Sequence, residues 1–224
     1  MENQIEHPKQ PRKRYGPRKA TAKRRQDILE AAMQVFAAKG SRAGTLSDVA
    51  ELAGMTHAGV LHHFGSKDNL LRAVLNFRDD SRGPEVRAAY GIDFFRHLIT
   101  TAEQNATRPG IVQTYVVLSA EAVTEDNPGV EYFTDRYQGL REMIFSQIRE
   151  LSPAANPLSD DELRLATSNI IALMDGLQVQ WLLSPDAVNL VQGTVFGIDA
   201  ILRRVAAGNS GDPMVTLDQI DDQD

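Results

Sequence analysis

A short stretch of the chain concentrates side chains that can donate and accept hydrogen bonds. Residues 56–63 read THAGVLHH, so hydroxyl and imidazole groups stand where a core helix would carry leucine. Such groups can contact the base edges or phosphates of a nucleic acid. The adjacent His62 and His63 also suggest a metal, but neighbouring helical residues point about 100° apart. Because the chain has no cysteine and no carboxylate cluster beside the two histidines, we expect no metal site here.

Short helices are predicted to hold this polar stretch in place. The first spans residues 21–39, and Gly40 suits its left-handed C-cap. The second begins at Thr45, which stands at capping-box spacing from Asp48, and it stops at Gly54. Thr56 caps the third, which ends near residue 63, and a fourth follows from residue 66. A helix, a tight glycine turn and a second short helix with an exposed polar face are typical of a DNA-binding helix-turn-helix.

Charge is divided unevenly along the chain. Residues 1–78 carry 14 Lys and Arg against 7 Asp and Glu, a net charge of +7, whereas the other 10 basic and 23 acidic residues give the remainder a net charge of −13. This asymmetry predicts a polyanionic partner for the first part only. Residues 1–22 are basic and contain prolines, and we expect them to be a disordered arm. The arm is either a solvated tail or a segment that follows DNA phosphates or enters a minor groove.

Residues 24–75 resemble the N-terminal domain of the TetR family of bacterial repressors. The matching stretches are RRQDILEAAMQVFAAKG (24–40), TLSDVAELAGM (45–55) and THAGVLHHFGSKDNLLRAVL (56–75). The resemblance covers about a quarter of the chain and implies that residues 56–63 form a recognition helix in the major groove. It also implies that Thr45 and Lys67 hold phosphates, and free N–H groups at a helix start favour such an anion. The DNA-binding residues predicted in this way are Arg24, Thr45, Thr56, His57, Gly59, His62, His63 and Lys67.

One position departs from the family pattern. Members often carry a tyrosine that donates to a phosphate where this chain has Leu61. Leucine has no donor, so we expect that contact to be lost or replaced. Gly59 also weakens the helix by roughly 1 kcal/mol relative to alanine, which predicts a recognition helix that is loose without DNA.

The rest of the chain shows only helical patterns, divided by proline and glycine. We expect helices at 85–106, 110–124, 128–151, 159–183 and 186–205, followed by a disordered acidic tail at 206–224. The predicted fold is therefore all-α, with an N-terminal three-helix helix-turn-helix domain and a C-terminal helical bundle that dimerises. Its predicted parts are a basic arm (1–22), a DNA-binding domain (23–65), a connecting helix (66–83), a ligand-binding and dimerisation domain (84–205) and the tail.

The last two helices are candidates for a dimer interface. Helix 159–183 is apolar on more than one side and must be covered on more than one side. The resemblance implies that it forms, with helix 186–205, half of a four-helix dimer interface; the alternative is that both helices are internal core. The predicted interface residues are Leu177, Val188, Val191, Val195, Ile198 and Leu202.

The middle helices are candidates for a small-molecule site. Apolar surface with a few polar groups is the usual composition of such a site, although the same residues also suit an ordinary core. Asp175 and Gln178 lie one turn apart in an apolar helix, and the sequence leaves open whether they anchor a ligand or pair across a dimer. The predicted ligand-binding residues are Phe94, His97, Tyr115, Tyr137, Met174, Gln178 and Trp181.

Several classes of protein are disfavoured by what the sequence lacks. Without cysteine there are no disulfides and no thiol catalysis, and no run of about 20 apolar residues is present. Catalytic and cofactor-binding motifs are also missing, so we expect a cytoplasmic protein that is not an enzyme and has no cofactor. The resemblance predicts a homodimeric regulator, commonly a repressor, that a small apolar or amphipathic molecule releases from a pseudo-palindromic operator, with helix 66–83 carrying the change. The alternative is a DNA-binding regulator controlled by a protein partner.

Overall fold

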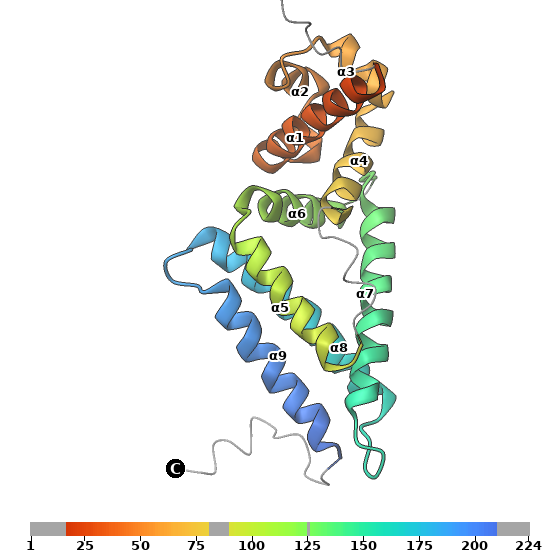
Figure 1. The fold of residues 1–224 in the computed structure, drawn as a ribbon, viewed down its shortest axis with the longest axis vertical. Helices are drawn as coiled ribbons and strands as arrows, with labels where there is room; N and C mark the ends of the chain where they lie inside the picture. Colours follow the sequence, from red (N-terminus) through yellow and green to blue (C-terminus); the bar gives the residue numbers. More distant parts are fainter. Residues whose placement is uncertain (1–16, 81–89, 125, 210–224) are drawn as a thin grey trace, which may run out of the picture.

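The computed structural model describes residues 17–80, 90–124 and 126–209. All regular structure in these ranges is helical, which confirms the predicted all-α fold (Figure 1). The helices extend into both segments that we assigned to the arm and the tail, whose remaining residues lie outside the described ranges. They are α1 (Pro17–Ala43), α2 (Leu46–Leu52), α3 (His57–Phe64), α4 (Lys67–Asp80), α5 (Ile92–Ala106), α6 (Pro109–Ala122), α7 (Val130–Leu151), α8 (Asp160–Leu183) and α9 (Leu190–Ala207).

Helix α1 does not stop at the expected C-cap but breaks there and continues. Gly40 has φ 75° and ψ 173°, a non-helical conformation inside α1. This region of backbone conformation is essentially open to glycine alone. One more helical turn follows to Ala43 before α2 begins, so Gly40 acts as a hinge within α1.

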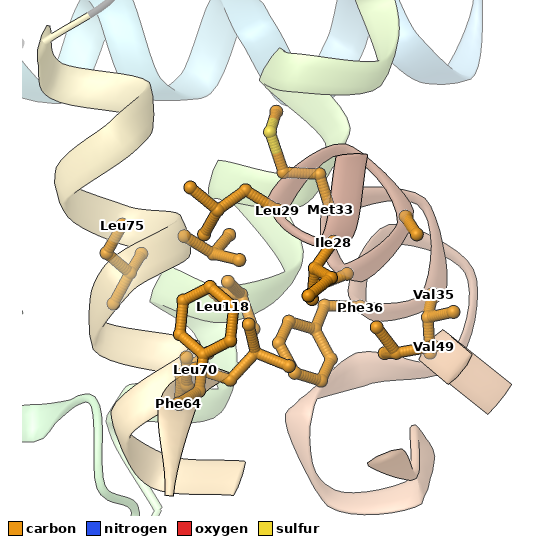
Figure 2. Close-up of a cluster of buried hydrophobic side chains, with 14 of the residues drawn as sticks. Ile28, Leu29, Met33, Val35, Phe36, Val49, Phe64, Leu70, Leu75 and Leu118 are labelled. Atoms are coloured by element: carbon orange, nitrogen blue, oxygen red, sulfur yellow. The ribbon is translucent and has the colours of Figure 1, made fainter. Parts of the chain in front are cut away.

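The N-terminal helices share a buried core with α6 and with the first turns of α7 of the larger domain. Ile28, Phe36 and Leu70 are fully buried between α1 and α4, and Val49 and Phe64 bring in α2 and α3. Figure 2 shows Leu118 of α6 among these side chains. The DNA-binding region is therefore packed onto α6, which lies across the molecule next to α1 (Figure 1).

A second core lies among the long helices α5, α7, α8 and α9. Phe94 and Phe95 of α5 pack edge to face, with ring centroids 5.3 Å apart. They join Ile148 of α7, Ile170 of α8 and Ile198 of α9, all at most 1% exposed. These helices run roughly along the length of the molecule (Figure 1) and hold α6 beneath the DNA-binding region.

The described residues contain neither a membrane-spanning helix nor a cluster of metal-binding side chains. None of the helices in residues 17–80, 90–124 and 126–209 is long and apolar enough to span a bilayer. Within the same ranges, no three His, Cys, Asp or Glu side chains gather in a way that could hold a metal ion. The rings of His62 and His63 lie 5.8 Å apart at 69° to each other, an edge-on arrangement.

Candidate DNA interface

The start of α2 is fixed by reciprocal hydrogen bonds. The Asp48 N–H donates to Thr45 Oγ1 (3.1 Å), and the Thr45 N–H donates to Asp48 Oδ2 (2.9 Å), which is the predicted capping box. Lys39 of α1 donates to Asp48 Oδ1 at 2.8 Å. The exposed Thr45 is therefore held rigidly at the surface, beside the end of α1.

The Asp48 carboxylate makes folding sensitive to acid. The hydrogen bonds from Lys39 and then Thr45 lower its pKa from the ordinary 3.8 to about 2. The resulting stability is present above pH 3.8 and is lost as the pH falls through about 2. We expect Asp48→Asn to flatten the dependence of the unfolding free energy on pH in this window. Urea titrations of both proteins across the window test this, and parallel curves would contradict it.

Helix α3 presents a polar face outward. Thr56 Oγ1 accepts from the Gly59 N–H at 3.1 Å and caps the helix. His57 and His62 are exposed and His63 is half-buried, while Val60 (0% exposed) and Phe64 (7%) face the core. Val60 and Phe64 thus anchor α3, and His57 and His62 remain exposed at its surface.

Two positions in α3, Gly59 and Leu61, pack against neighbouring residues of the protein. A side chain at Gly59 would place its Cβ 3.2 Å from Met55 Cε, so this glycine makes room for the Met55 side chain. Leu61 packs against the N-terminal core and does not project freely. Gly59 therefore contributes to α3 through close packing.

The basic residues around α3 are held at the surface in different ways. Arg24 is exposed, as predicted. Arg25, which sequence reasoning missed, donates to the His63 carbonyl at 3.4 Å and lies 4.2 Å from the Phe64 ring centroid. Its place one turn before the first buried residue, Ile28, was the only available signal. Arg25 ties α1 to the end of the recognition helix.

Lys67 has a structural contact that the sequence did not indicate. Its Nζ donates to the Arg42 carbonyl at 3.0 Å, which joins the start of α4 to the last turn of α1. An ammonium group has three donors, so this contact leaves Lys67 able to bind a phosphate as well. Lys67 is half-buried.

The segment 39–42, which we call the α1 hinge, is also tied to the larger domain. Glu121 of α6 accepts from the Ser41 N–H at 2.6 Å. Arg42 Nη2 donates to Thr124 Oγ1 at 3.0 Å. The hinge therefore joins α6 to the starts of α2 and α4, through Lys39 and Lys67.

Helix α4, which we expected to connect the domains, makes fewer contacts with the larger domain among the described residues. The Tyr132 hydroxyl of α7 donates to the Leu75 carbonyl at 3.3 Å. Arg72 and Glu131 approach to 3.6 Å but both are exposed. The α1–α6 contact is a second connection that the sequence analysis missed.

The residues predicted for the dimer interface differ in how deeply they are buried in the protomer. Ile198 is 1% exposed in the protomer's own second core, so it offers no surface to a second chain. Leu177 packs against Gly193 of α9, since a Cβ there would lie 3.0 Å from its methyl group. Val195 is 40% exposed. The remaining three, Val188, Val191 and Leu202, are half-buried.

The exposed apolar surface of α8 and α9 includes residues that sequence reasoning missed. Phe196 of α9 is 80% exposed and Leu183 of α8 is 78% exposed, and Val179 of α8 and Val195 of α9 are each 40% exposed. Phe196 directly follows Val195, which was predicted for the dimer interface. Its large apolar side chain was the feature of the sequence that could have identified it. These four residues form what we call the apolar face of α8 and α9.

Four of the seven predicted ligand-binding residues divide between the two cores. Phe94 and Met174 belong to the second core or pack against it. Tyr115 and Tyr137 belong to or pack against the N-terminal core. The other three are Gln178, which is buried, and His97 and Trp181, which are half-buried. A groove between α7 and α8, with a volume of about 590 Å³, is lined by other residues: Gln138, Arg141, Glu142, Phe145, Arg164, Thr167 and Ser168.

Asp175 and Gln178 lie inside the protomer. The Tyr137 hydroxyl donates to Asp175 Oδ2 at 2.6 Å. Burial, followed by the neighbouring Tyr115 and Asp175, raises the pKa of Tyr137, so this phenol remains a donor at neutral pH. Gln178 is only 5% exposed. Within the protomer, Asp175 thus accepts a hydrogen bond from Tyr137 and Gln178 is buried.

Comparisons with known proteins agree with this architecture. Residues 28–74 match the family described as bacterial regulatory proteins of the tetR family, and residues 96–205 match the C-terminal region of BetI-type transcriptional repressors. The transcriptional regulator BetI of Rhizobium meliloti is 28% identical over 84% of this chain and 92% of its own length. The regulator TtgR of Pseudomonas putida is 28% identical over 75% of this chain and 84% of its own.

A solved structure supports the fold across both domains. The crystal structure of a transcriptional regulator from Rhodococcus sp. Rha1 superposes with a TM-score of 0.64 at 21% identity, over 81% of this chain and 97% of that one. The two family matches lie on the helix-turn-helix and on the larger helical domain. The chain therefore belongs to the TetR family of bacterial regulatory proteins and is a DNA-binding transcriptional regulator.

Proposed function

We propose that the protein is a ligand-responsive repressor that binds a pseudo-palindromic operator as a homodimer and is released by a small molecule. The observation that carries the DNA-binding part is helix α3, whose polar face is exposed while Val60 and Phe64 anchor its other side. Basic side chains surround this face, and the net charge of +7 is confined to residues 1–78. Phosphate contacts orient such a domain and base contacts give it sequence preference.

The proposed DNA contacts have different roles according to where each residue lies. His57, His62 and His63 lie on the surface of α3 and are assigned to bases or backbone in the major groove. Arg24, Thr45, Thr56 and Lys67 surround them and are assigned mainly to phosphates. Gly59 is assigned a packing role against Met55. The α1 hinge keeps Thr45 and Lys67 at a fixed spacing.

The apolar face of α8 and α9 is assigned to the dimer. Phe196 and Leu183 are each more than three-quarters exposed. Exposing such apolar side chains to water is unfavourable, and covering them with a second protein surface stabilises the complex. A two-fold pair of such faces gives a self-complementary interface, and two reading heads match two half-sites. The partner is therefore a second copy of this chain.

The ligand is assigned to the interior of the larger domain, near Tyr115, Tyr137 and Gln178. A ligand shifts the equilibrium between two dimer states only by its difference in affinity for them. Helix α6 carries Tyr115 near its middle and Glu121 near its end, so it connects this interior with the α1 hinge. A displacement of α6 would therefore reach the reading heads through α1 as well as through α4.

Two substitutions test the assignment of DNA contacts. Lys67→Ala should weaken binding to every DNA sequence and make the salt dependence shallower by about one unit per protomer. His62→Ala should change the preferred sequence and leave the salt dependence unaltered. Fluorescence anisotropy at several salt concentrations measures both.

The design needs a control because Lys67 also bonds to Arg42. Melting temperatures identify any loss that comes from unfolding. Arg96→Ala removes a side chain of the same charge, exposed on α5, and should leave DNA binding unchanged. If DNA binding by Lys67→Ala and by Arg96→Ala depended equally on salt concentration, Lys67 would not be a phosphate contact.

A further inference from the structure

The groove between α7 and α8 is a hollow of the size that small molecules occupy. Its volume of about 590 Å³ lies within the usual range of about 300–1,000 Å³ for such sites. Its walls come from residues 138–145 of α7 and residues 164–168 of α8. None of the residues assigned above to the dimer or to the interior ligand lines it. The groove is therefore a separate candidate site in the larger domain.

Phe145 supplies the groove with an aromatic ring. It is half-buried and packs against the second core, which holds the ring in place. The guanidinium of Arg164, on α8, lies over this ring, 4.7 Å from its centroid. Arg141 precedes Phe145 by four positions on α7, and residues at this spacing are neighbours on a helix surface. Arginines from both helices therefore border one aromatic ring.

Positive charge exceeds negative charge in the groove. Neither Arg141 nor Arg164 has an ion pair with another residue in the described part of the chain. Glu142 is the acidic residue of the lining, and its Oε1 accepts from Gln138 Nε2 at 2.9 Å. Two guanidinium groups and one carboxylate leave a net charge of +1. The groove therefore matches a ligand with a single negative charge.

The donors of the groove suit a planar anion. A guanidinium group presents N–H donors in a fixed fork that pairs with both oxygens of a carboxylate. Ser168 is exposed and follows Arg164 by four positions, so its hydroxyl offers a further donor on the same side of α8. The Thr167 hydroxyl donates to the Leu163 carbonyl at 2.8 Å and is already satisfied within the helix. The donors left for a ligand are those of the two arginines and Ser168.

We propose that the groove binds an amphipathic carboxylate, whose oxygens accept from Arg141 and Arg164 and whose apolar part lies against Phe145. This site is additional to the interior ligand site proposed above. A neutral amide of the same shape keeps the apolar contact and loses the charge-assisted hydrogen bonds. An amine of the same shape is repelled by both guanidinium groups.

The test compares matched probes on the full-length protein in the absence of DNA. Each of three apolar groups, phenylethyl, naphthylethyl and octyl, is prepared as a carboxylate, a primary amide and a primary amine. Calorimetric titration measures their binding at low and at high salt. We expect the carboxylate of at least one series to bind roughly tenfold more tightly than its amide and its amine, as one charge-assisted hydrogen bond allows. This preference should shrink at high salt, because the groove is open to solvent.

Substitutions attribute the preference to the groove. Arg141→Gln and Arg164→Gln should each reduce the preference for the carboxylate over the amide, and the double variant should abolish it. Glu142→Gln keeps an oxygen that can accept from Gln138 and removes a negative charge, so it should strengthen binding of the carboxylate and leave the amide unchanged. The matched control is Arg149→Gln, an exposed arginine of α7 outside the groove lining, which should change neither.

A further variant tests the apolar contact. Phe145→Leu keeps an apolar side chain and removes the ring, so it should weaken binding of the carboxylate and the amide alike and leave the preference between them unchanged. Melting temperatures establish that each variant is folded.

The outcomes decide the inference without reference to DNA. It is overturned if no series prefers its carboxylate, or if the double variant of Arg141 and Arg164 retains the preference, because the carboxylate then binds elsewhere. A protein that prefers the carboxylate through these two arginines but binds no DNA would support this site and overturn the proposed repressor function.

Discussion

Phe196→Asp is expected to convert the protein from a dimer into a monomer. Phe196 is 80% exposed in the protomer and is the most exposed member of the apolar face of α8 and α9. A two-fold interface contains the residue twice, and an aromatic anchor contributes about 2 kcal/mol or more per copy. A loss of about 4 kcal/mol corresponds to a roughly thousandfold weaker dimer. Sedimentation equilibrium measures this directly.

The consequence for DNA follows from the two half-sites. A monomer contacts one half-site at a time, so operator affinity should fall by orders of magnitude while the melting behaviour of the protomer stays that of a folded protein. Tyr90→Asp is the matched control, because Tyr90 is 76% exposed and lies outside α8 and α9. If Phe196→Asp remained a dimer with unchanged affinity, the interface would lie elsewhere.

Gly40→Ala is expected to destabilise the protein strongly for a substitution of one methyl group. At φ 75° and ψ 173° a side chain costs about 1–3 kcal/mol in backbone strain. The added Cβ would also occupy the position of the Glu121 carboxylate, which must move away from the Ser41 N–H. Losing that hydrogen bond adds about 1.5–3 kcal/mol, because the acceptor is charged. Urea unfolding of both proteins measures the sum.

A double-mutant cycle separates strain from the contact between domains. Glu121→Ala removes the carboxylate, so Gly40→Ala should cost less in that background than in the native protein, with a coupling of about 1.5–3 kcal/mol. Glu131→Gln serves as control, since Glu131 crosses between the same two regions as an exposed partner of Arg72. Additive losses for Gly40→Ala and Glu121→Ala would show that the α1 hinge and α6 are not coupled.

Local signals in the sequence were sufficient for the helix starts. Thr45 with Asp48 forms the capping box that their spacing predicted, and Thr56 caps α3. Ser159 and Glu162 form a second box of the same spacing at the start of α8. The helix-turn-helix was predictable for the same reason, because caps, glycine turns and the apolar face of α1 depend on residues close together in sequence. The all-α fold follows from these signals repeated along the chain.

Contacts between distant residues were not predictable. Glu121 lies 80 positions from Ser41, and nothing in its surrounding sequence marks it as the partner of a broken helix. Ile198 and Phe196 illustrate the same difficulty on one helix. Both are large and apolar, but the first is 1% exposed and the second 80%, and only the packing of α5 and α8 against α9 decides which is covered.

The most direct test of the account is selection of preferred sequences from random duplex DNA by the full-length protein, followed by anisotropy titration of the selected duplex against an unselected one. The account predicts an enriched pseudo-palindrome whose half-site centres lie one helical turn, or a multiple of it, apart. It also predicts that two chains, or a multiple of two, bind each site far more tightly than the control. If no sequence were enriched and all duplexes bound equally weakly or not at all, the protein would not be the sequence-specific DNA-binding regulator described above.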